Sequence, residues 1–232
     1  MLRSLIIISC AFSIFGCASK GFDRGSLREQ IGTVKPVVND SEIKEVLARK
    51  PNLPKPFKLA VYFKRPISKS SAEASWRWTD QDKDLVTAAA NELSSEKIIS
   101  SVSIIPESLV LVEDLKSIRL AAARQSANAV LVIDGAAESD RYINNWGWSY
   151  MLLVPALFVK GSEVDTLFMS SAVLWDVGNE YLYLTTEAEG LAHETYAPVS
   201  TVRDEDLFKT AKSNSLEKLK AQIVSSIKGS KN

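Results

Sequence analysis

Few residues in this sequence could do chemistry. His193 is the only histidine in the 232 residues, and both cysteines, Cys10 and Cys17, lie within the first seventeen. A zinc protease helix needs two histidines in the pattern H-E-x-x-H, and a serine hydrolase needs a G-x-S-x-G elbow, and the sequence has neither. The glycine-rich loops that bind nucleotides are also missing. We therefore expect no metal, no cofactor and no catalytic site, with a hydrolase as an alternative for which no catalytic residues can be named.

Cys17 closes a segment with the features of a secretory signal. Met1-Leu2-Arg3 is basic, Leu5 to Phe15 is apolar apart from two serines and Cys10, and Ile14-Phe15-Gly16-Cys17 follows. A basic start, a short apolar core and a small residue before the cut are typical of such signals. The last four residues resemble the lipobox of bacterial lipoproteins. That resemblance implies cleavage after Gly16 and a diacylated Cys17 as the first residue of the mature chain.

This anchor has two alternatives. Ile7-Ile8-Ser9-Cys10 also fits a lipobox, but a cut after Ser9 leaves an apolar core of about five residues, shorter than the usual ~7–15. An uncleaved anchor needs ~20 apolar residues, and Lys20 and Asp23 end the run too early. Ala18 after the lipid cysteine implies sorting to the outer membrane, by analogy with enteric lipoproteins. We expect the domain to face the periplasm.

Two tryptophan pairs are candidate partner-binding residues. Trp76 and Trp78 flank Arg77, and Trp146 and Trp148 flank Gly147. On an extended segment, residues i and i+2 share one side, so each pair could stack on a sugar ring or anchor a protein. The favoured alternative is that one or both pairs cover the edge of the core, because tryptophan is usually largely buried.

The run from Tyr150 to Val159 is apolar throughout, with Leu153 near its middle. Ten residues are too few for a spanning helix but enough for a spanning strand. A strand in a water-lined barrel should alternate apolar and polar residues, and this run does not. We favour a buried strand or docked loop, with a protein-interaction patch as the alternative. Tyr150 and Leu153 therefore join the candidate partner-binding residues.

The composition limits the classes of partner. Lys plus Arg and Asp plus Glu are 28 each, so the chain carries no strong basic field for nucleic acid and no polybasic patch for anionic lipid. Apolar residues make up 46% of the chain, enough to build a core. With one cysteine cleaved off and the other acylated, no disulfide is expected, so packing alone must hold the domain together.

Three regions follow from these observations. Residues 1–16 are the expected signal peptide, and residues 17–56 the lipidated cysteine, a flexible tether, a short helix at Ser41–Arg49 and a proline-rich approach. The polar stretch Ala18–Asp40 would span ~25 Å as a coil. Residues 57–232 are expected to form one domain.

Apolar periodicity predicts the elements of that domain. The order is β-α-β-α-β, followed by a β-hairpin and a carboxy-terminal helix, which gives an α/β fold with a mixed sheet and helices packed on it. Thr79 or Asp80 is expected to cap the first helix, and Asn128 to take a left-handed position after the second. The expected strands are 57–63, 97–105, 129–135, 166–177 and 180–189, and the expected helices are 81–94, 113–127 and 204–227.

The hairpin allows a prediction of register. A two-residue Gly178-Asn179 turn would pair Val177 with Glu180, Trp175 with Leu182 and Val173 with Leu184. The face that carries Trp175 is the more apolar near the turn, so we expect it to be the core face under the helices. Trp175 should then be largely buried, and Asp176→Ala should cost little stability.

Two segments resemble a group of bacterial envelope lipoproteins. In Ser126-Ala127-Asn128-Ala129-Val130-Leu131-Val132 a helix end leads into a hydrophobic strand, and in Ala172-Val173-Leu174-Trp175-Asp176-Val177-Gly178-Asn179-Glu180-Tyr181-Leu182-Tyr183 a strand ends in Asp-Val before a returning strand. The group includes the curli-secretion lipoprotein, the activator lipoproteins of penicillin-binding proteins and the amino-terminal domain of TolB. The resemblance covers about residues 57–228. It implies a compact α/β module that binds other envelope proteins or assembles with itself, and it does not imply catalysis.

We therefore expect a non-enzymatic binding or assembly accessory, anchored by lipid in the outer membrane and facing the periplasm. Its partners would be the membrane, through the lipid, an envelope protein, and a second copy of the chain in a homo-oligomer. The alternative is a subunit of an oligomeric secretion pore that uses the region from Asn144 to Gly161.

Overall fold

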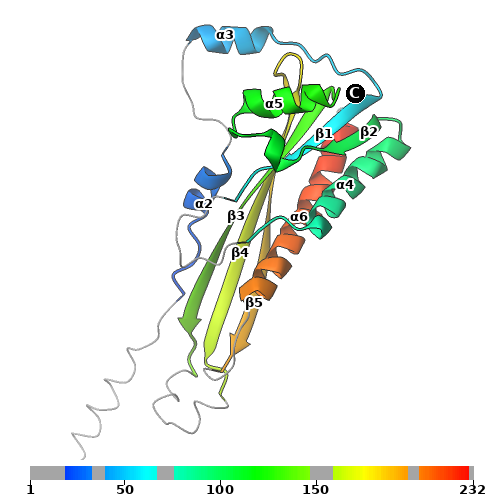
Figure 1. The fold of residues 1–232 in the computed structure, drawn as a ribbon. Helices are drawn as coiled ribbons and strands as arrows, with labels where there is room; N and C mark the ends of the chain where they lie inside the picture. The colour runs from blue at the N-terminus through cyan, green and yellow to red at the C-terminus, as the bar shows by residue number, and fades with distance from the viewer. Residues whose placement is uncertain (1–18, 33–39, 67–75, 147–158, 198–203, 230–232) are drawn as a thin grey trace, which may run out of the picture.

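The computed structural model describes residues 19–32, 40–66, 76–146, 159–197 and 204–229 (Figure 1). One five-stranded sheet organises the chain, in the order β2-β1-β3-β4-β5. The first three strands are parallel to one another, and β4 and β5 are antiparallel to their neighbours, which confirms the predicted mixed sheet. The strands are β1 (Phe57–Phe63), β2 (Ile99–Ile104), β3 (Ala129–Ile143), β4 (Ser162–Asp176) and β5 (Leu182–Tyr196).

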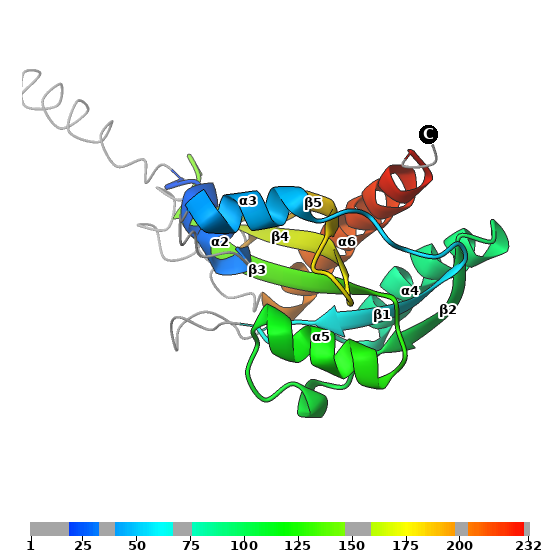
Figure 2. The ribbon, with the colours of Figure 1, turned by 90° about the horizontal axis from the view of Figure 1, so that it is seen from above.

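Helices cover both faces of the sheet (Figure 2). Helices α4 and α6 lie on one face, against a large core that includes Leu59, Leu131 and Leu174. Helix α5 covers Tyr62 and Val132 on the opposite face. Strands buried on both faces read as continuous apolar runs, which is why β1 and the first half of β3 were recognisable in the sequence. The helices are α2 (Arg24–Ile31), α3 (Asp40–Ala48), α4 (Asp80–Ser95), α5 (Leu115–Arg124) and α6 (Asp204–Gly229), with a short 3-10 turn, η2 (Glu107–Leu109).

Strands β3, β4 and β5 extend well beyond the parallel part of the sheet. Strand β1 ends at Phe63, which pairs with Ile133, whereas β3 continues from Asp134 to Ile143. At about 3.3 Å per residue, these ten further residues add about 33 Å. We call this three-stranded extension the arm, and residues 143–146 at its end the tip. The sequence prediction ended β3 at residue 135 because the polar residues that follow resemble a loop.

The β4–β5 turn differs from the predicted two-residue turn. The amide of Asp176 donates to the carbonyl of Tyr181 at 2.9 Å, so four residues, Val177 to Glu180, form the turn. Glu180 has a φ of 59°. The carboxylate of Asp176 explains the wider turn, because it accepts hydrogen bonds from the amides of Gly178 at 2.8 Å and Asn179 at 3.1 Å.

The wider turn also changes the predicted faces. Trp175 pairs with Leu182 as expected, but an irregularity beside it places Leu174, rather than Val173, opposite Leu184. Leu174 and Leu184 belong to the core under α4 and α6, while half-buried Trp175 packs on the α5 side. Trp175 was expected to be largely buried under the helices. It lies on the face that α5 covers and is only half-buried, so the predicted burial was wrong. Strand β4 is buried on both faces along most of its length, so apolarity near the turn could not separate them.

Two local predictions also need correction. Ser126, with a φ of 58°, takes the left-handed position expected for Asn128. Asn128 instead accepts a hydrogen bond from the amide of Lys58 at 2.8 Å. In addition, part of the expected tether forms α2, whose Leu27 and Ile31 pack against Ala136, Leu167 and Met169 of the arm.

Candidate functional site

Trp76 and Trp78 lie against the core. Trp78 is 8% exposed, and its indole N–H donates to the carbonyl of Lys64 at 2.7 Å. Its ring centroid lies 5.3 Å from that of Phe63, and the Trp76 ring lies 4.7 Å from Phe168. The alternative in which this pair covers the core is therefore the one that the structure shows, and Trp78 offers no open ring face to a partner.

A buried lysine fixes this tryptophan segment to two helices. The Nζ of Lys212 on α6 lies 2.5 Å from a carboxylate oxygen of Asp82 on α4 and donates to the carbonyl of Arg77 at 2.6 Å. It also lies 6.0 Å from the centroids of both Trp76 and Trp78, within the range of a cation–π interaction. These contacts satisfy the buried charge, so Lys212 acts as a structural clamp.

A second buried ion pair lies where β1 ends beside β3, the place where open α/β sheets often bind ligands. The Nζ of Lys64 lies 2.5 Å from a carboxylate oxygen of Asp134, and this carboxylate also accepts from the amide of Gly135 at 2.8 Å. Burial raises the pKa of Asp134, although Lys64 opposes the shift. The Asp134 and Lys64 side chains thus pair with each other instead of facing a ligand.

Beside this pair, Tyr62 donates to Glu113 at 2.6 Å, and the side chain of Arg65 lies 3.3 Å from the same oxygen. Burial, followed by the hydrogen bond to Glu113, raises the pKa of Tyr62. The guanidinium of Arg65 also donates to the carbonyl of Val110 at 2.6 Å, which fixes the loop before α5. This cluster therefore positions the loop rather than a reacting group.

The histidine is part of a hydrogen-bonded line across the arm. Nδ1 of His193 lies 2.7 Å from Asp165, and Nε2 lies 3.1 Å from the hydroxyl of Thr195. Tyr142 donates to the same aspartate at 2.9 Å, and its hydrogen bonds to Glu163 and Asp165, together with burial, raise its pKa. The order of the hydroxyl, imidazole and carboxylate groups resembles a catalytic triad, in which a histidine relays the proton of a hydroxyl nucleophile.

Exposure argues against a relay of this kind. The His193 side chain is 52% exposed on an open sheet face, whereas a catalytic site surrounds its substrate and excludes water. Among the described residues, no group of three histidine, cysteine or carboxylate side chains is placed to hold a metal ion. The line instead ties together neighbouring strands of the arm.

The amino-terminal segment is fastened to the arm close to its tip. The hydroxyl of Ser19 donates to Asp140 at 2.7 Å, the amide of Gly21 donates to the same carboxylate at 3.1 Å, and the amide of Asp23 donates to Glu138 at 3.1 Å. Asp140 lies three residues before Ile143, the last residue of β3. The chain therefore meets the arm two residues after Cys17.

The tip exposes apolar side chains. Trp146 is 65% exposed and Ile143 is 44% exposed. Asn144 orders this segment, because its carbonyl oxygen accepts from the amide of Trp146 at 2.9 Å and its NH2 donates to Glu163 at 2.7 Å. Of the other predicted site residues, Cys17, Trp148, Tyr150 and Leu153 lie outside the described residues.

A further apolar surface, which the sequence analysis did not identify, lies beside α5. Leu111 is 87% exposed, and Val112 and Leu120 are also exposed. The preceding Val110 is fully buried and is held by Arg65 as described above, so the loop presents Leu111 and Val112 in a fixed position. We call Leu111, Val112 and Leu120 the α5 patch. Leu111 and Val112 lie in a short loop, where apolar residues follow no periodic spacing. The sequence therefore gives no signal that separates them from core residues.

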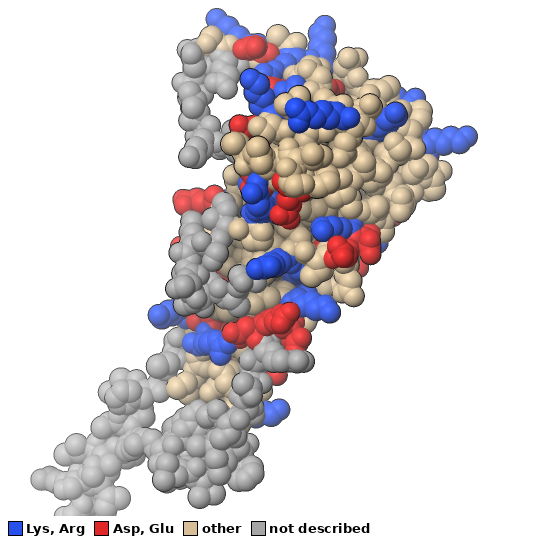
Figure 3. Space-filling model, viewed as in Figure 1, with Lys and Arg blue, Asp and Glu red and all other residues tan. Residues whose placement is uncertain are grey.

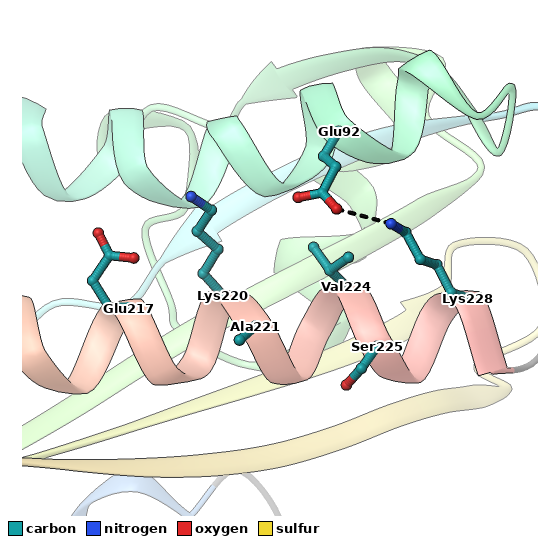
Figure 4. Close-up of a pocket in the computed structure, with 7 residues that line it drawn as sticks. All are labelled: Glu92, Glu217, Lys220, Ala221, Val224, Ser225 and Lys228. Atoms are coloured by element: carbon teal, nitrogen blue, oxygen red, sulfur yellow. Dashed lines mark hydrogen bonds and ion pairs between the residues drawn. The ribbon is translucent and has the colours of Figure 1, made fainter.

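A shallow groove of about 480 Å³ runs between α4 and α6 (Figure 4). Lys228 crosses it to reach Glu92 at 2.8 Å and Glu96 at 2.7 Å, and these two hydrogen bonds raise the pKa of the lysine. The ion pair occupies one end of the groove, which mixes charges of both signs and suits no single class of ligand. The lining residues are Glu92, Glu217, Lys220, Ala221, Val224, Ser225 and Lys228.

Comparison with known proteins gives similar folds but no family. No family model and no curated protein matches the chain. Among solved structures, the PelC dodecamer from Paraburkholderia phytofirmans is 19% identical, with 78% of this chain and 95% of that chain covered and a TM-score of 0.36. A minor lipoprotein from Acinetobacter baumannii is 13% identical, with coverage of 77% and 95% and a TM-score of 0.34.

Lipoprotein GNA1162 from Neisseria meningitidis is 14% identical, with 74% of this chain and 99% of that chain covered and a TM-score of 0.31. Bacterial lipoproteins therefore recur among the similar structures. Among the helices that the structure describes, none combines the length and the hydropathy that crossing a bilayer requires.

Proposed function

We propose that this chain is a lipid-anchored accessory of the bacterial cell envelope, which binds or assembles with a protein there and does not act as an enzyme. The observation that carries the proposal is the attachment of Ser19 to Asp140 of the arm, immediately after the lipobox-like sequence. This attachment would fix the position of a lipid on Cys17 relative to the folded domain.

The attachment would hold the arm against the membrane. Ser19 follows Cys17 by two positions, with only Ala18 between them, and two steps along the chain span about 7 Å at most. A lipid on Cys17 would therefore lie close to the end of the arm, with Ile143 and Trp146 of the tip beside it. Tryptophan is favoured at the membrane–water interface, where its ring is half in apolar surroundings. An acyl anchor and an aromatic contact together would bind the membrane more firmly than either alone.

The same orientation would leave the α5 patch free for a protein. Helix α5 covers the parallel part of the sheet, and the arm reaches about 33 Å beyond that part toward the tip. The apolar side chains of the patch would face the periplasm, where exposed apolar residues mark protein-binding surfaces. Ala18 supports the outer membrane as the site of attachment.

Two cysteine variants test the anchor. The Cys17→Ala chain should carry no acyl group by mass spectrometry and should leave the membrane fraction on washing with salt and carbonate. The Cys10→Ala chain is the matched control and should stay acylated and membrane-bound. The opposite result, with lipid lost only from the Cys10→Ala chain, would place the cleavage site after Ser9 and overturn the proposed geometry.

A further inference from the structure

Strand β2 is one edge of the sheet, and within the described part of the chain no strand pairs with its outer side (Figure 2). The amide of Ile105 donates to the carbonyl of Val61 at 2.8 Å, so Ile105 faces β1. Because the backbone groups of successive residues point to alternate sides, Val102 and Ile104 direct their amides and carbonyls away from the sheet. The carbonyl of Ile104 has one long contact, from the side chain of Gln125 at 3.5 Å. These backbone groups form a template for a further strand.

The opposite edge of the sheet, β5, is closed by α6. The side chain of Asn214 donates to the carbonyl of Leu191 at 3.0 Å, and the Nζ of Lys218 donates to the carbonyl of Glu189 at 2.8 Å. These hydrogen bonds occupy carbonyls of the edge strand, and the charged side chains beside them oppose the approach of another strand. The fold therefore protects the β5 edge by means that the β2 edge lacks.

The β2 edge is uncharged along its whole length. No charged residue occurs from Ile98 to Ile105, and the irregularity in its pairing with β1 lies between Ile99 and Ser101, before the stretch that ends at Ile105. Natural edge strands usually carry a charge, a proline or a bulge that prevents pairing with another chain. Figure 3 shows mostly uncharged atoms where β2 lies in Figure 1. An edge of this kind favours the addition of an extended segment.

Opposite charges lie at the two ends of this edge. Lys97 precedes β2 and Glu107 follows it, and both side chains are exposed. Within the part of the chain that the structure describes, neither side chain forms an ion pair or a hydrogen bond. A strand added in the antiparallel orientation, the more stable one, would begin beside Glu107 and end beside Lys97. It would therefore be favoured by a basic residue at its start and an acidic residue at its end.

The direction of the arm decides whether a second copy could supply that strand. Strand β2 has the required order of charges itself, with Lys97 at its start and Glu107 at its end. The arm continues the direction of β3, however, and β3 and β2 are both parallel to β1. Antiparallel pairing of two β2 strands would thus point the two arms in opposite directions, and both tips could not lie on one membrane as proposed above.

We propose that β2 binds an extended segment of another envelope protein, which adds to the sheet as a further antiparallel strand with a basic residue at its start and an acidic residue at its end. This inference deepens the proposed function, because it names the conformation and the charges of the segment that the partner offers. It rests on the proposed function, because the contact of the tip with the membrane excludes a second copy at β2.

A synthetic peptide tests this mode of binding. The acylated full-length chain, purified in detergent, would be titrated into a fluorescein-labelled peptide of alternating threonine and valine, with lysine at its start and glutamate at its end. We expect the fluorescence anisotropy to rise to a plateau. A peptide with the same side chains and with N-methyl groups on all its internal amides cannot donate backbone hydrogen bonds and should not bind. Equal binding of both peptides, or binding of neither, would overturn the proposal.

Substitutions at Val102 locate the bound peptide. Val102→Pro removes an amide that faces away from β1 and places a ring in the path of the added strand, so it should abolish binding without disturbing the pairing with β1. Val102→Ala retains the amide and is the matched control, which should bind as the wild type does. Thermal unfolding checks that both variants are folded. Full affinity of a folded Val102→Pro chain would overturn the proposal.

Charge reversal at one end of β2 adds a second readout. Lys97→Glu should weaken binding of the peptide about three- to tenfold, and a peptide with lysine at both ends should restore it. Affinities that neither change affects would overturn the role of the charges in selecting the segment.

Light scattering during size-exclusion chromatography of the same detergent sample distinguishes a partner strand from pairing between copies. We expect the wild type and Val102→Pro chains to have the same mass. A wild-type dimer that Val102→Pro dissociates would overturn the proposal, because a second copy would then occupy β2. Binding of the peptide does not depend on acylation of Cys17, so failure at β2 and failure of the anchor are distinguishable.

Discussion

Asp134 is a carboxylate whose titration should be visible in the stability of the whole domain. Burial raises its pKa, so the folded state holds the proton more tightly than the unfolded state. The contribution of Asp134 to the free energy of unfolding is then largest below about pH 4 and falls as the pH rises through its raised pKa. In urea titrations from about pH 4 upward, the wild type should lose stability relative to Asp134→Asn. Parallel pH profiles for the two proteins would contradict this expectation.

Asp176 should contribute much more to the stability of the domain than we expected from its position beside a turn. Its carboxylate is buried and accepts hydrogen bonds from two turn amides and, at 3.2 Å, from the hydroxyl of Tyr183. Asp176→Ala should lower the free energy of unfolding by about 1–3 kcal/mol, because it leaves these donors without their acceptor. Urea unfolding measures this change, with Asp84→Ala on the exposed side of α4 as control. Equal stability of the two variants would show that water replaces the carboxylate.

The sequence shows which residues are apolar, but it does not show every surface against which those residues pack. The spacing of Trp76 and Trp78 indicated a shared side, and their place on the core depends on Phe168 and Lys212, which are far away in the chain. The prediction of the turn failed for a similar reason. Gly178-Asn179 is a good signal for a two-residue turn, but the Asp176 carboxylate accepts hydrogen bonds from the amides of Gly178 and Asn179 and so stabilises a wider turn. Long-range and side-chain-to-backbone contacts of this kind leave no periodic pattern.

At the scale of whole elements, the close contact between α6 and β5 depends on small residues where the helix meets the strand. Gly190 lies directly under Ala211 and Ser215, and the Ser215 hydroxyl donates to the carbonyl of Ala188 at 3.0 Å. A methyl group at position 190 would clash with the backbone of α6 at Ala211 and Ser215. Backbone cannot yield as a flexible side chain does, so the helix would have to move off the sheet.

Gly190→Ala should therefore destabilise the domain by about 1–3 kcal/mol or more, as overpacking does. Thermal unfolding followed by circular dichroism measures the effect. Gly229→Ala, at the end of α6 where a methyl group meets no atom within 4 Å, is the matched control and should melt like the wild type. An unchanged melting temperature for Gly190→Ala would mean that α6 lies farther from β5 than the structure places it.

Elements with strong periodicity were predictable, and short or polar ones were not. The β-α-β-α-β order, the cap of α4 at Thr79 and the long α6 followed from apolar spacing and capping residues. Helix α2 has only two buried apolar residues, Leu27 and Ile31, in a polar stretch, so the sequence favoured a coil. In the second half of β3, buried and exposed residues alternate only weakly, because α2 covers only part of the face against which it packs.

At the scale of the whole molecule, the arm separates two surfaces of different character. Trp146 and Ile143 lie at the tip beside the attached amino-terminal segment, and the α5 patch lies on the parallel part of the sheet. The sequence predicted a lipid anchor at Cys17 and named Trp146 as a candidate, and the hydrogen bonds from Ser19 and Gly21 to Asp140 show that the chain just after Cys17 lies against the arm near its tip. The direction in which we propose that the domain meets the membrane therefore depends on tertiary contacts.

That direction can be measured with a fluorophore at each end of the molecule. In the acylated protein on vesicles, a bimane attached at Ile143→Cys should be quenched by brominated lipids, because the tip would lie at the interface. The same label at Lys97→Cys, an exposed residue in the turn before β2 and away from the arm, should not be quenched. Quenching at position 97 but not at position 143 would mean that the arm points away from the membrane. Equal quenching at both positions would mean that the long axis of the sheet lies along the surface, and in that case the α5 patch would no longer be held clear of the lipid.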